Sequence, residues 1–135
     1  MDDREIVRRC AEAAGWKFTW SDKHRYWHAI DPEYREYIVC EKWPMRDAYS
    51  GAKLPDPTPE DAIEECGYDP LTNDAQAMAL VKRFPISIRK WTGTKQQRVE
   101  IVDGVTGEMR FYSDSPDLNR AICTAVANMQ EAKGG

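Results

Sequence analysis

Apolar positions near the start of the chain recur at the spacing of an α-helix, with four of them between residues 6 and 14 on one helical face. Asp2 can cap this helix because Glu5 follows three positions later, and Gly15 supplies a stop. The pattern therefore predicts a helix over residues 2–14.

The spacing changes in residues 16–50, an aromatic-rich segment that holds nine of the fourteen aromatic residues. Trp16, Phe18 and Trp20 alternate with polar residues, which is typical of a strand. Residues 21–30 then suit the turn and second strand of a hairpin. Residues 33–42 fit a helix or a strand equally well, and the pattern leaves both open.

The next stretch, residues 51–70, is rich in proline and acidic side chains and predicts a loop followed by a short helix. Thr58 is a suitable helix cap and Pro59 a favoured first residue. A further cap within residues 72–74 precedes an apolar stripe of helical spacing that Pro85 ends.

Period-two alternation covers residues 86–112, with Gly-containing connections at 92–94 and 103–107. This indicates an antiparallel meander of three strands. Ser115 as cap and Pro116 as first residue predict a final helix, whose continuous apolar stripe can cover the meander.

Together these patterns predict an α+β fold in which an antiparallel sheet of at least three strands packs with the N- and C-terminal helices as a layered sandwich. A chain of 135 residues is the size of one domain, so we expect a single domain over residues 1–135. No apolar run is long enough to span a bilayer, and no leader precedes the first helix, which predicts a soluble, cytoplasmic protein.

The net charge of −4 disfavours a general nucleic-acid binder, which would be basic. The four cysteines, at positions 10, 40, 66 and 123, lie far apart without paired spacing, which favours free thiols over disulfides.

Three segments resemble a known family: the run from Tyr68 to Phe84, the run from Ser115 to Ala125, and the corner Ala13–Trp16 after the first helix. They are similar to the phage ABA-sandwich domains, which are small proteins encoded by phages and prophages. The resemblance implies a layered α/β fold and a phage or prophage origin. It carries over no catalytic residues.

Charge is unevenly distributed along the chain. Residues 54–81 carry seven acids and no base, whereas residues 82–100 carry six bases and one acid. The acidic block could meet a basic protein groove, or it could be an exposed helix that complements the neighbouring strands. Its candidate binding residues are Glu60, Asp61, Glu64 and Glu65.

Strand alternation defines a second candidate surface on the meander. If helices cover its apolar face, the opposite face shows the polar and aromatic set Arg89, Trp91, Arg98, Glu100, Arg110 and Tyr112. Arginine with tryptophan and tyrosine is typical of interfaces and base-stacking platforms. Cross-strand Arg–Glu pairing, or packing of the aromatic-rich segment over this face, would explain the same residues without a ligand.

The sequence offers little for catalysis or metal binding. His24 and His28 would lie about 13 Å apart along a strand, too far to share a metal ion, and we expect no metal or cofactor. No nucleophile, phosphate-loop or dinucleotide motif occurs. An enzyme that uses Cys40 with His24 or His28 is the catalytic alternative.

We therefore expect a non-enzymatic phage or prophage accessory protein that binds a host protein, such as an inhibitor of a bacterial defence system of the anti-CRISPR kind. The alternative is a small-molecule or nucleotide binder that uses the polar face of the sheet. Direct nucleic-acid binding and membrane contact are not expected, and the oligomeric state is open.

Overall fold

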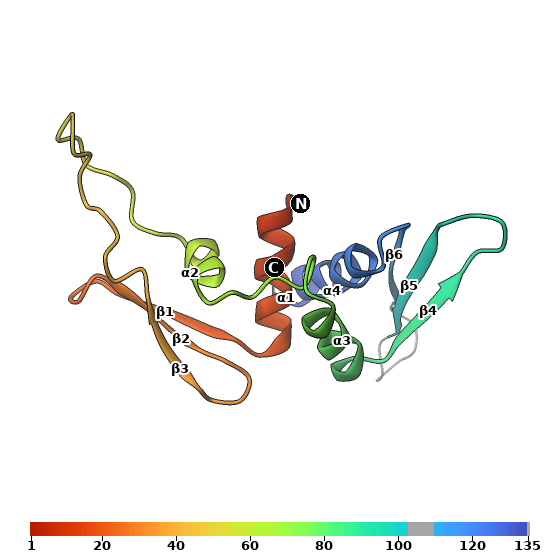
Figure 1. The fold of residues 1–135 in the computed structure, drawn as a ribbon. Coiled ribbons are helices and arrows are strands. Elements are labelled where there is room, and N and C mark those ends of the chain that lie inside the picture. Colours follow the sequence, from red (N-terminus) through yellow and green to blue (C-terminus); the bar gives the residue numbers. More distant parts are fainter. Residues whose placement is uncertain (103–109, 135) are drawn as a thin grey trace. The chain divides into compact units, whose positions relative to one another are not determined.

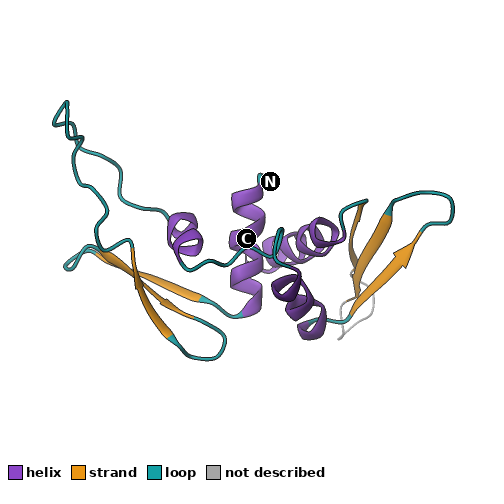
Figure 2. Ribbon diagram, viewed as in Figure 1, coloured by secondary structure: helices purple, strands orange, loops and turns teal. Residues whose placement is uncertain are grey.

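A computed structural model describes residues 1–102 and 110–134 of the chain. Within these ranges it contains four helices and two three-stranded antiparallel sheets (Figures 1 and 2). The predicted α+β class, with a helix near each end of the chain, is confirmed.

The chain divides into two compact units. The first is formed by Met1–Ala14 and Asp69–Gly135, and the second by Gly15–Tyr68. The single domain over residues 1–135 stays a prediction.

In the first unit, α1 (Asp3–Ala14) forms as its sequence pattern predicts. The Asp2 carboxylate accepts a hydrogen bond of 2.8 Å from the backbone N–H of Glu5, which satisfies one of the unpaired donors at the helix start. Gly15 ends the helix with a φ of 103°, a conformation that other residues rarely adopt.

The two remaining helices of this unit are α3 (Asp74–Arg83) and α4 (Leu118–Gly134). Asn73 caps α3 by accepting from the N–H of Gln76. The prediction that Ser115 caps α4 and Pro116 begins it is wrong. Ser115 still pairs with Gln97 in the sheet that precedes the helix. The helix starts at Leu118, two residues after Pro116, and the Asp117 side chain accepts a hydrogen bond from the N–H of Arg120.

The predicted meander is confirmed as β4 (Ile86–Lys90), β5 (Gln97–Val102) and β6 (Arg110–Ser115), paired in that order. The predicted connection at 103–107 lies outside the described residues. Met109, an apolar position of the predicted third strand, also lies outside them.

Helix α4 covers this sheet by packing on β5 and β6, and α1 and α3 pack on α4 (Figure 1). Val99 and Ile101 from β5 are buried beneath it. The helices contribute further buried side chains to the core of this unit: Leu80, Ile122, Val126, Cys10 and Cys123. Hydrophobic burial between the sheet and its helices therefore holds the first unit together.

The second unit contains β1 (Lys17–Ser21), β2 (Tyr26–Ile30), β3 (Glu36–Val39) and α2 (Pro59–Glu65). The strands pair in chain order as a second antiparallel sheet. The segment that fitted either a helix or a strand thus forms β3.

Asp31 determines the turn between β2 and β3. Its carboxylate is buried, yet it accepts hydrogen bonds from the backbone N–H groups of Glu33 and Arg35, the Arg35 guanidinium and the Tyr37 hydroxyl. Burial raises the pKa of this carboxyl, but the hydrogen bonds outweigh it and hold the pKa below its ordinary value. The turn is therefore held by the buried Asp31 carboxylate, both oxygens of which accept hydrogen bonds.

Aromatic side chains pack on one another within the second unit. Trp16 stacks on Phe18 and Tyr37 and lies tilted against Tyr68, with ring centroids 5.7 to 5.8 Å apart. Trp27 donates its indole N–H to the carbonyl of Pro57 at 2.8 Å. Most aromatic side chains of the aromatic-rich segment therefore pack within their own unit.

Candidate interaction surface

The strand register places the polar candidates of the meander on one face of the sheet. Arg89 lies opposite Arg98, and Glu100 opposite Tyr112, whereas Val99 and its partners alternate onto the side that α4 covers. The backbone of Arg110 pairs with Val102, but the side chain of Arg110 lies outside the described part of the structure.

Arg98 is the centre of this surface. Its guanidinium carbon lies 4.8 Å from the ring centroid of Tyr112 and 5.3 Å from that of Trp91. Both aromatic residues are exposed, at 57% for Tyr112 and 41% for Trp91. A guanidinium at this distance from an aromatic ring is attracted to it, so Arg98 makes a favourable contact with both side chains.

Asp114 completes the cluster, which we call the Arg98 cluster: Trp91, Arg98, Tyr112 and Asp114. Arg98 donates to both carboxylate oxygens of Asp114, at 2.8 and 3.0 Å. These hydrogen bonds, the charge of Arg98 and a contribution from the Trp91 side chain hold the pKa of Asp114 below its ordinary value.

The sequence pattern did not single out Asp114. It lies two positions after Tyr112 and so alternates onto the same face, a signal that was available from strand periodicity. Cross-strand Arg–Glu pairing was one of the alternatives left open by the sequence, and the ion pair of Arg98 that the structure records is with Asp114.

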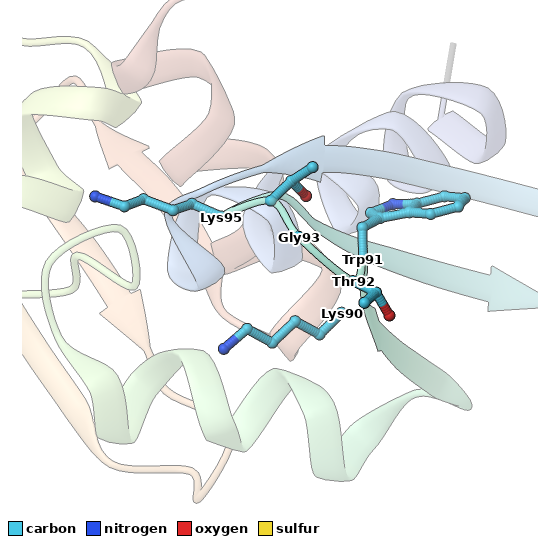
Figure 3. A pocket seen from close by; sticks show the side chains of 6 residues that line it. Lys90, Trp91, Thr92, Gly93 and Lys95 are labelled. Atoms are coloured by element: carbon cyan, nitrogen blue, oxygen red, sulfur yellow. The ribbon is translucent and has the colours of Figure 1, made fainter.

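Beside this cluster, the turn between β4 and β5 surrounds an open hollow of about 500 Å³. Six consecutive residues line it, Lys90 to Lys95. Figure 3 shows the ammonium groups of Lys90 and Lys95 extending to one side of the turn and the Trp91 indole to the other. The turn therefore presents two positive charges on one side and an aromatic ring on the other.

The four candidate acids lie on or near α2, and two of them have structural roles. Asp61 forms a capping box with Thr58, in which each side chain accepts from the other's backbone N–H. Glu65 accepts a hydrogen bond of 2.6 Å from the backbone N–H of Cys40, just after β3. Glu64 is exposed and Glu60 half-buried. The acidic block therefore contributes to local structure as well as to the surface.

The cysteine and histidine candidates are placed as follows. His28 lies on β2, 3.6 Å from Glu36, and His24 stacks on Tyr26. Burial, and then the neighbouring Glu65, raise the pKa of Cys40 to about 12, which disfavours the thiolate that a nucleophile needs. All four cysteines are free thiols, as expected.

Within residues 1–102 and 110–134, no group of three His, Cys, Asp or Glu side chains is arranged to hold a metal ion. The helices in these ranges include none with the length and apolar character that a membrane span requires.

Comparison of the chain with protein-family models, with curated proteins and with solved structures gave no match.

Proposed function

We propose that this protein is a non-enzymatic binding protein whose partner, a protein, contacts the Arg98 cluster. The observation that carries the proposal is the exposed pair Trp91 and Tyr112, whose ring centroids lie 5.3 and 4.8 Å from the Arg98 guanidinium carbon. The few residues that contribute most of the binding energy at protein interfaces are enriched in tryptophan, tyrosine and arginine. Because the cluster is ordered before binding, a partner that covers it has a smaller entropic cost to overcome.

The resemblance to phage ABA-sandwich domains supports a host protein in the bacterial cytoplasm as the partner. The function that we propose is inhibition of a bacterial defence system, such as a CRISPR nuclease complex. Such an inhibitor needs a binding surface and no chemistry of its own.

Affinity capture from lysates of several bacterial strains tests the interface. The variant carries Trp91→Ala and Tyr112→Ala, and the matched control carries Tyr34→Ala and Tyr49→Ala, two tyrosines exposed at 86% and 100% outside the cluster. We expect the wild type and the control to retain a stoichiometric partner and the cluster variant to lose it, with affinity reduced about thirtyfold or more. Failure to recover a partner from any strain, or equal recovery by both variants, would contradict the proposal.

The proposed inhibition has its own test. Phage plating is measured on a host with an active CRISPR system, with and without this protein. Inhibition predicts that plating rises when the wild type is expressed and not when the cluster variant is expressed. Unchanged plating across several defence systems would remove this part of the proposal and leave the binding surface standing.

A nucleotide or other small anion is the second candidate, and the hollow at the β4–β5 turn favours it. Lys90 and Lys95 bring two ammonium groups to one side of the turn, where they would neutralise the charge of a phosphate. A thermal-shift panel of nucleotides with the wild type and with Lys90→Ala plus Lys95→Ala discriminates this candidate. Stabilisation that disappears in the double variant would favour the nucleotide over the protein partner.

A further inference from the structure

Strand β4 is an edge of its sheet, because in the described part of the chain it pairs only with β5. The N–H of Trp91 donates to the carbonyl of Gln96, which continues the β4–β5 ladder beyond the strand end. Hydrogen-bonded and non-bonded pairs alternate in an antiparallel ladder, so Ser87 and Arg89 bond to β5. The backbone N–H and C=O groups of Ile88 and Lys90 therefore point away from the sheet.

These outward groups meet no hydrogen-bond partner among residues 1–102 and 110–134. They form a short row of donors and acceptors with the spacing that an added strand requires.

The same edge carries an exposed apolar side chain. Ile88 is 43% exposed, although Val99, its partner across the ladder, is buried. Helix α4 packs on β5 and β6, and no comparable packing of a helix on β4 occurs in the described residues. An added strand would bury Ile88 as well as pair its backbone.

Positive charge lies along this edge. Arg89 and Lys90 belong to the strand and Lys95 to the turn that follows it. None of these three side chains forms an ion pair with a described residue. Two copies of β4 would each bring Arg89 and Lys90 to a common ladder, so pairing between copies is disfavoured, whereas an acidic strand is attracted.

The edge of β3 shows how an exposed strand is protected in the same protein. It also carries an exposed isoleucine, Ile38, but the N–H of Cys40 at its end already donates to the Glu65 carboxylate. The strand β3 itself carries the acid Glu36 and no base, so it offers an acidic segment no electrostatic attraction. Of these two edges, β4 is the one open to an acidic strand.

We infer that β4 is a docking edge for an extended acidic segment of a partner protein, which adds a fourth strand beside Ile86–Lys90. The inference rests on the proposed function only in that the partner is a protein. In an antiparallel arrangement, acidic residues of the segment lie opposite Lys90 and Arg89, and apolar residues lie opposite Ile88 and Ile86. Backbone pairing supplies affinity and the charges supply specificity.

A synthetic peptide with the central sequence Glu-Glu-Val-Thr-Val is the probe, and its counterpart with Lys-Lys in place of Glu-Glu is the control. We expect fluorescence anisotropy to show about tenfold tighter binding of the acidic peptide. Amide hydrogen exchange supplies the direct readout of strand addition, because the acidic peptide should slow exchange at Ile88 and Lys90. Exchange at Ser87 and Arg89, whose N–H groups already bond to β5, should change little.

Ile88→Pro is the matched variant, because proline removes an outward N–H that the β4–β5 ladder does not use. It should abolish peptide binding while Ile88→Val preserves it. If Ile88→Pro does not fold, the charge reversal Arg89→Glu with Lys90→Glu takes its place, and it should reverse the preference toward the lysine peptide.

Three results would overturn the inference: no protection of the Ile88 and Lys90 amides, equal binding of both peptides, or binding that survives Ile88→Pro in a folded protein. Binding of a single-stranded oligonucleotide that responds to charge reversal and not to Ile88→Pro would also overturn it, in favour of a polyanion surface. Loss of the captured partner in the Trp91 and Tyr112 variant, with normal capture by Ile88→Pro, would reject the docking edge and retain the proposed function.

Discussion

Arg98 and Asp114 lie opposite each other across the β5–β6 ladder and are joined by two hydrogen bonds, of 2.8 and 3.0 Å. The pair does more than neutralise charge, because the guanidinium that Asp114 holds is the one that lies over Trp91 and Tyr112. Asp114 is therefore a positioning residue for the Arg98 cluster.

The first prediction concerns this positioning role. Asp114→Ala should weaken binding of a captured partner about tenfold, because Arg98 must then be ordered on binding. The melting temperature should change little, since both side chains are more than one-third exposed and such pairs add little to stability. Isothermal titration and thermal unfolding measure the two effects. A large loss of stability with unchanged affinity would assign the pair a structural role instead.

The second prediction is a pH dependence that arises from Asp31. Its pKa in the folded protein lies below the ordinary aspartate value of about 3.9. A lowered folded-state pKa contributes stability that is complete above the ordinary value and is lost as the pH falls through the folded-state value. The urea concentration at the midpoint of unfolding should therefore decrease when the pH is lowered below about 4. This decrease should be smaller in Asp31→Asn than in the wild type.

Asp22→Asn is the control for this measurement, because the Asp22 side chain is 88% exposed. Its acid dependence should match that of the wild type. If Asp31→Asn also matches the wild type, the hydrogen bonds to Asp31 do not stabilise the folded state over the unfolded one.

The third prediction concerns thiol reactivity. Burial, followed by neighbouring acids, raises the pKa of Cys40 to about 12 and that of Cys66 to about 11. Alkylation by iodoacetamide near neutral pH should therefore be far slower in the folded protein than in urea, and Cys66, the one cysteine that is not fully buried, should react first. Peptide mass spectrometry over time follows each site. Rapid alkylation of Cys40 would favour the alternative in which it acts as a nucleophile.

The local signals of the sequence were sufficient for most elements of the fold. Caps such as Asp2, Thr58 and Asn73 act on the next few residues, so they can be recognised without tertiary information. The start of α4 was placed too early because Ser115 satisfies the capping pattern and also continues β6. That competition is decided by pairing with Gln97, which is distant in the sequence.

Other features could not be predicted from local pattern. Tyr37 and Ile38 suit a helix or a strand, and the hydrogen bonds that Asp31 accepts around the β2–β3 turn favour the strand. The division into two units depends on which distant segments bury one another. The position of Asp114 followed from alternation, but its choice over Glu100 as the partner of Arg98 required the register.

The fourth prediction tests the expected single domain. In Trp91→Phe, the remaining tryptophans all belong to the second unit, so fluorescence reports on that unit, whereas α1, α3 and α4 dominate the helical circular dichroism of the first. We expect the two urea transitions to coincide, because a unit below about 60 residues without a disulfide or metal is only marginally stable alone. Separate midpoints would show that the units fold independently.

Trp16 and Tyr68, near the two ends of the second unit, touch with their ring centroids 5.7 Å apart. The unit thus closes on itself between the two stretches of chain that build the first. A segment with this arrangement can be replaced as a whole, because a contact between its own side chains holds its two ends together. Its length and surface can therefore change during evolution, or be exchanged by an engineer, while the chain on either side keeps its course.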